Sequence, residues 1–82
     1  MLQDALSVRF YQRITDALVD QWNRGYRTDE LRLYLDGYLA AMRHGDIVEP
    51  YQIHRIEEEA IRFLHDGANF ATPQPQPEPD YY

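Results

Sequence analysis

TDELRLYLDGYLAAMRH, residues 28–44, is the stretch of sequence that decides the fold. At about 100° per residue, its apolar side chains fall on two separate faces of one helix. The second face is a thin stripe of Leu33, Gly37, Ala40 and His44. The first face spans roughly 160°, enough to contact two neighbouring helices. It carries Leu31, Tyr34, Leu35, Tyr38, Leu39, Ala41 and Met42. A small bundle needs only this broad face, so the thin stripe is the first indication of a partner.

The ends of this central helix carry typical capping residues. Thr28 is the expected N-cap, and Gly45 is the expected end of the helix. Gly37 lies inside the helix, where glycine costs about 1 kcal/mol relative to alanine. We therefore expect Gly37 to allow close approach of another backbone, either within the bundle or from another molecule.

Two further helices are predicted, over residues 2–24 and 50–66. Gly25 ends the first, since glycine adopts the left-handed conformation without a steric penalty. Pro50 opens the last, because its missing N–H is not needed in the first helical turn. The sequence therefore predicts an all-α, three-helix bundle over residues 1–67.

The first helix has a wider apolar arc than a bundle needs. Its apolar residues recur every four positions from Leu2 to Trp22, so the stripe winds around the helix. The arc reaches roughly 200° and includes Val19 and Trp22. These two residues are candidates for contact with a partner, although scattered exposed apolar groups are also normal on protein surfaces.

Residues 68–82 form a predicted proline-rich, acidic tail that ends in PQPQPEPDYY. Alternating prolines exclude helix and favour the extended polyproline II conformation. Two hypotheses remain open for this tail, namely a solubilising end or a docking peptide. Pro77, Pro79, Tyr81 and Tyr82 are its interface candidates.

Length and composition exclude several classes of protein. Eighty-two residues make one domain, and the absence of cysteine excludes disulfide bonds. A net charge of −6 disfavours nucleic acid as a ligand. No apolar run approaches the roughly 20 residues of a membrane span, and the first residues do not read as a signal peptide. We expect a soluble protein with no transmembrane segment.

Side chains that could carry chemistry are few. His54 and His65 are eleven residues apart on one helix, about 16 Å, so they cannot share a metal ion. Glu57 projects into the apolar arc of the third helix. It is either a general acid or base with a raised pKa, or a carboxylate bonded to an arginine or tyrosine of a neighbouring helix. The second interpretation is favoured, so we predict no enzyme, no catalytic residue, no cofactor and no metal.

The sequence NRGYRTDELRLYLDGYLAAMRHGDIVEPYQIHRIEEEAIRFL, together with the ending PEPDYY, resembles a small family of cyanobacterial proteins with no assigned function. The likeness covers most of residues 21–64 and the tail, and it transfers no catalytic or binding residue. It implies a photosynthetic host and a place in the cytosol or on the cytosolic face of thylakoid complexes.

These features predict a non-catalytic, protein-binding accessory or regulatory subunit. It would dock on a larger complex through its helix surfaces and the tail, and the implied host makes the photosynthetic machinery a natural setting. A second hypothesis is a self-associating structural module, in which the thin stripe pairs copies of the chain. A third is a small enzyme or ligand carrier that uses Glu57.

Overall fold

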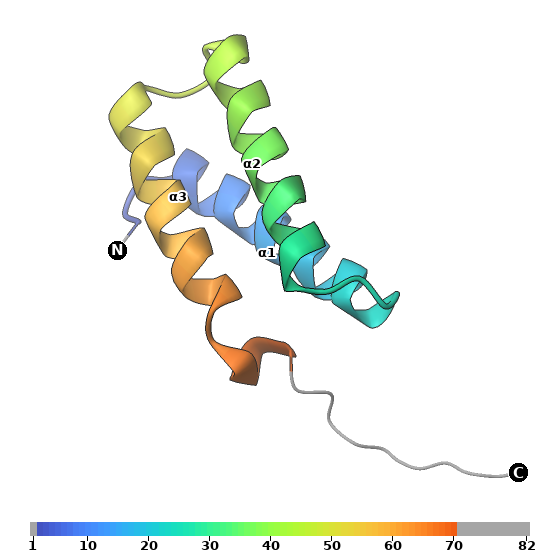
Figure 1. Cartoon of the computed structure of the whole chain (residues 1–82). Helices are drawn as coiled ribbons and strands as arrows, with labels where there is room; N and C mark the ends of the chain where they lie inside the picture. The colour runs from blue at the N-terminus through green and yellow to red at the C-terminus, as the bar shows by residue number, and fades with distance from the viewer. Residues whose placement is uncertain (1, 71–82) are drawn as a thin grey trace, which may run out of the picture.

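The structure, a computed structural model, describes residues 2–70, and all of the regular secondary structure in that range is helical. It contains α1 (Ala5–Asn23), α2 (Thr28–Gly45), α3 (Pro50–Leu64) and a short 3-10 helix, η1 (Gly67–Phe70). In Figure 1, α2 and α3 lie side by side, and α1 crosses them obliquely on one side. The predicted all-α fold with three α-helices is confirmed. The predicted tail, with Pro77, Pro79, Tyr81 and Tyr82, lies outside the described residues.

The start of α1 is set by a side-chain cap. The Asp4 carboxylate accepts a hydrogen bond from the Ser7 backbone N–H at 2.9 Å. This cap satisfies one of the N–H groups that have no partner within the helix. α1 therefore begins at Ala5, three residues after the predicted start.

Both ends of α2 differ from the predicted capping pattern. The N-cap is Arg27 rather than Thr28, and the Arg27 backbone N–H donates to Glu30 Oε1 at 2.8 Å. At the other end Gly45 is still helical, and Asp46 adopts the left-handed conformation with φ 52°. The Glu30 carboxylate, at position N3, accepts from the backbone N–H of the N-cap residue, which is one half of a capping box. Aspartate tolerates the left-handed conformation better than most residues.

The core is a single apolar cluster to which all three helices contribute. α2 supplies its broad face in part: Leu31, Leu35, Leu39 and Met42 are buried. Tyr34 and Tyr38 are half-buried, and Ala41 is exposed. The sequence placed Ala41 on the broad face that contacts the neighbouring helices. In the structure α1 and α3 cover a narrower arc of α2, and Ala41 lies outside it.

The buried residues of α1 differ in part from the predicted set, in which apolar residues recur at every fourth position. Ser7 and Thr15 are buried, whereas Leu6 is 38% exposed. Small polar side chains allow close packing of helices, and the Thr15 hydroxyl donates to the Gln12 carbonyl at 3.1 Å. Ile14 and Leu18 of the predicted stripe are fully buried, and Leu2, Phe10 and Trp22 pack against the core. Ser7 and Thr15 therefore add to this stripe where α1 crosses its neighbours obliquely (Figure 1).

Residues beyond α3 complete the core. Phe70 of η1 is 8% exposed, and its ring lies 5.2 Å from the ring of Trp22 and 5.5 Å from that of Phe63. These distances are typical of favourable aromatic pairs. The core therefore includes Phe70, which the sequence assigned to the tail.

Candidate interaction surface

The thin stripe of α2 is not covered by the rest of the fold. Leu33 is 72% exposed, Gly37 and His44 are exposed, and Ala40 is half-buried. A Cβ atom built on Gly37 would meet no atom within 4 Å. The prediction that another backbone of the bundle lies close to Gly37 is therefore wrong. This glycine has no packing role among the described residues.

The stripe continues into a wider uncharged surface. Around α2, at 100° per residue, Ala41, Tyr34 and Tyr38 follow directly after Leu33 and Gly37. The rings of Tyr34 and Tyr38 lie 5.9 Å apart. We call this surface the α2 face, and its members are Leu33, Tyr34, Gly37, Tyr38, Ala40 and Ala41.

Charged side chains lie at the two ends of the α2 face, where Glu30 and His44 fall on the same arc, and not in its middle. Burial raises the pKa of the Tyr34 hydroxyl, so this group stays neutral well above neutral pH. The charged residues of the middle of α2 lie on the opposite flank of the helix, where Arg32 Nε pairs with Asp36 Oδ1 at 3.0 Å. An uncharged, tyrosine-containing surface of this kind is typical of protein interfaces.

An apolar notch adjoins the α2 face. It has a volume of about 170 Å³ and is lined by Phe10, Tyr38, Ala41, Met42 and Ile47. Ile47, in the loop after α2, is 53% exposed. Helical periodicity did not reveal this notch, since its lining comes from α1, α2 and a loop.

Trp22 and Val19, the candidates on α1 for contact with a partner, are partly covered by the fold. Both are half-buried and pack against the core. The Arg27 guanidinium lies 4.1 Å from the centre of the Trp22 ring, and Arg27 Nη1 donates to the Trp22 carbonyl at 3.1 Å. Trp22 thus joins α1 to the start of α2 and, through its ring contact, to Phe70. Much of its surface is used inside the fold.

Glu57 lies between α2 and α3. Its Oε1 is 3.2 Å from Arg43 Nη2, and its side chain is 26% exposed. This is the arginine partner that the favoured interpretation of Glu57 expected. The ion pair joins two helices at the surface, where such pairs stabilise a fold only modestly.

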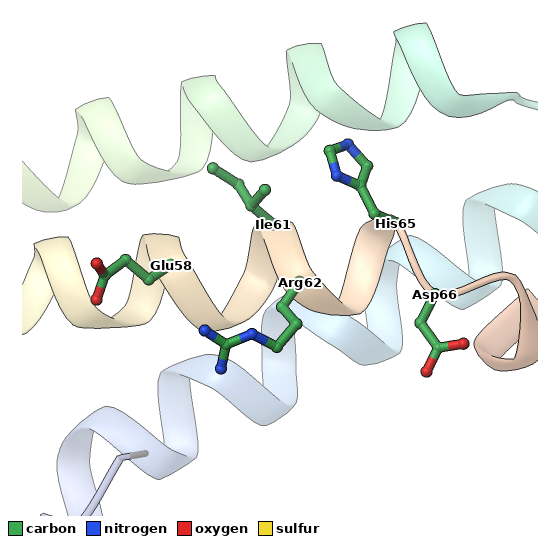
Figure 2. A pocket seen from close by; sticks show the side chains of 5 residues that line it. All are labelled: Glu58, Ile61, Arg62, His65 and Asp66. Carbon is green, nitrogen blue, oxygen red and sulfur yellow. The ribbon is translucent and has the colours of Figure 1, made fainter.

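A further hollow lies along α3 and is lined by ionisable side chains together with Ile61. Figure 2 shows this hollow, with Ile61 and His65 on one side of the helix and Arg62 and Asp66 on the other. Arg62 Nη1 pairs with Glu59 Oε2 at 3.1 Å, within the same helix. Within residues 2–70, no group of three His, Asp or Glu side chains is placed to hold a metal ion.

No helix in the described part of the chain is both long and apolar enough to cross a membrane.

The fold and this surface define a small three-helix protein with an uncovered, uncharged face on its central helix. The chain belongs to a family of unknown function (DUF6761), whose model matches residues 1–82. No curated protein and no solved structure matches it. Membership of an uncharacterised family agrees with the resemblance described above, and the cyanobacterial host that it implies stays a prediction.

Proposed function

We propose that this protein is a non-catalytic, protein-binding accessory or regulatory subunit that docks on a larger complex. The observation that carries the proposal is the α2 face, where Leu33 is 72% exposed beside a glycine whose neighbourhood is open. A helix interior gains nothing from such a glycine, which costs about 1 kcal/mol relative to alanine. Contact with another protein gives both residues a role.

The apolar notch strengthens the proposal, because it extends the α2 face with further apolar surface. Contiguous exposed apolar patches are characteristic of interaction sites in soluble proteins. Tyrosine, present twice on the α2 face, is among the residues that most often dominate binding energy.

The C-terminal residues are the second proposed docking element. Pro77, Pro79, Tyr81 and Tyr82 combine an extended backbone preference with two terminal aromatic side chains. In a cyanobacterial host, the larger complex would belong to the photosynthetic machinery or to carbon or nitrogen assimilation. The protein would then act in the cytosol or at the cytosolic face of thylakoid complexes.

Affinity purification of the full chain from its native host, followed by mass spectrometry, tests this proposal. We expect one defined complex to co-purify, and the amount recovered to fall at least about tenfold when residues 73–82 are removed. Equal recovery by the truncated chain would contradict the role of the tail. If no complex co-purifies at all, the proposal as a whole fails.

A further inference from the structure

The α2 faces of two copies of the chain are complementary in shape when the helices pair antiparallel with Gly37 at the centre. In an antiparallel pair of helices centred on one residue, each position before the centre lies opposite the position equally far after it. Leu33, four residues before Gly37, would therefore lie opposite Ala41, four residues after it. The largest exposed aliphatic side chain of the face meets a small one, and glycine meets glycine, where two backbones can approach closely.

The notch provides a receptor for Leu33. Ala41 is one of its walls, so a leucine placed over Ala41 also reaches Phe10 and Ile47. Because a two-fold contact is the same on both partners, each Leu33 would enter the notch of the other copy. Leu33 and Ile47, which are 72% and 53% exposed, would both be covered by one contact.

Charge selects the antiparallel direction. The first turn of α2 carries Asp29 and Glu30, and the last turn carries Arg43 and His44. Antiparallel pairing places the acidic first turn opposite the basic last turn, with Glu30 facing His44, whereas parallel pairing would place like charges together. The two helix dipoles also oppose each other in this arrangement.

We propose that the α2 face binds the α2 face of a second copy of this chain, antiparallel and about a two-fold axis at Gly37. This inference rests on the proposed function and narrows it, because a second copy would cover the α2 face. Docking on the larger complex would then use the second proposed docking element, the C-terminal residues.

Sedimentation equilibrium of the full chain measures the first consequence. At about 200 µM we expect a mass twice that of the 9.8 kDa chain. Leu33→Glu should raise the dissociation constant at least about tenfold, because a carboxylate would then enter an apolar notch. Tyr51→Glu is the matched control, since Tyr51 is 66% exposed but lies on α3, and it should leave the dimer unchanged.

Disulfide cross-linking tests the geometry, since the chain has no cysteine of its own. Gly37→Cys should form an intermolecular disulfide under mild oxidation, because a bridge needs Cα atoms within about 7 Å. Tyr51→Cys, at an exposed position on α3, should not. A mixture of Leu33→Cys and Ala41→Cys chains should cross-link to each other in preference to themselves, as only antiparallel pairing allows.

Two results would overturn the inference. A chain that stays at 9.8 kDa at about 500 µM would assign the α2 face to a different protein. A dimer that tolerates Leu33→Glu and does not cross-link through Gly37→Cys would use another surface. Either result leaves tail-dependent co-purification of a larger complex unaffected, so failure of the dimer and failure of the proposed function are distinguishable.

Discussion

Single residues at the helix ends decide where the helices begin. Asp4 starts α1 through its hydrogen bond to the Ser7 N–H, and Glu30 starts α2 through its bond to the Arg27 N–H. Each carboxylate also lies at a helix N-terminus, where a negative charge interacts favourably with the helix dipole. Such local interactions explain why α1 begins three residues after its predicted start, whereas α2 and α3 begin at the predicted residues.

Asp4 gives the stability of the fold a defined pH dependence. The hydrogen bond from the Ser7 N–H holds the pKa of Asp4 below its ordinary value of 3.8. Because the folded-state pKa lies below the unfolded one, the contribution of this cap is fully present above about pH 4 and is lost as the pH falls through the folded pKa. Asp4→Asn keeps a capping oxygen but removes the titration.

We therefore expect the free energy of unfolding of the native chain and of Asp4→Asn to differ most at neutral pH and to converge in acid. Urea denaturation from about pH 7 to pH 2.5 measures the difference. Asp16→Asn, an exposed position in the middle of α1, is the control for loss of a charge without loss of a cap. A difference that stays constant with pH would contradict the role of Asp4.

At the scale of elements, α2 differs from its neighbours because part of its surface is not used for folding. Its buried residues face α1 and α3, and the α2 face remains outside. The turn before it is held by Arg27, whose guanidinium stacks on Trp22 and donates to two backbone carbonyls. α2 is thus firmly placed while one side stays uncovered.

Gly37→Ala separates the folding role of α2 from its binding role. Since a Cβ at this position meets no atom within 4 Å, the variant should be more stable by about 1 kcal/mol through helix propensity alone. Chemical denaturation at about 1 µM, where the proposed dimer dissociates, measures this gain. The same variant should weaken the dimer, because the added methyl groups separate the two backbones.

Asp16→Ala, at an exposed position in the middle of α1, is the control for a change to alanine that leaves the α2 face intact. It should leave the dimer unchanged. If Gly37→Ala were instead less stable than the native chain, a backbone contact at Gly37 within the fold would be the explanation.

For the whole molecule, stability depends in part on the packing of η1 against α1 and α3. Phe70 closes one end by packing on Trp22 of α1 and Phe63 of α3. The protein is small, and domains of this size have a total stability of only about 5–10 kcal/mol. A single aromatic contact is a substantial part of such a total.

Phe70→Ala should lower the free energy of unfolding by about 3 kcal/mol, as expected for loss of a buried aromatic ring. The fluorescence of Trp22, the single tryptophan of the chain, reports unfolding directly. Phe70→Leu keeps most of the apolar volume and should cost less than half as much. Native stability in Phe70→Ala would show that η1 contributes nothing to the core.

The sequence by itself determined the helical class, the three helices and the two faces of α2. These depend on the 100° spacing of side chains along one helix and on local capping groups, which are encoded within a few residues. For the same reason Leu33 and Gly37 could be recognised as surplus to the core, and Glu57 as a carboxylate in need of a partner.

Only the tertiary structure decided which residues of α1 are buried, how the notch forms and that Phe70 belongs to the core. Ser7 and Thr15 are buried because α1 crosses its neighbours obliquely, and Phe10 and Ile47 meet because that crossing brings α1 to the loop after α2. Crossing angles follow from simultaneous packing of all three helices. No periodicity along one segment contains that information.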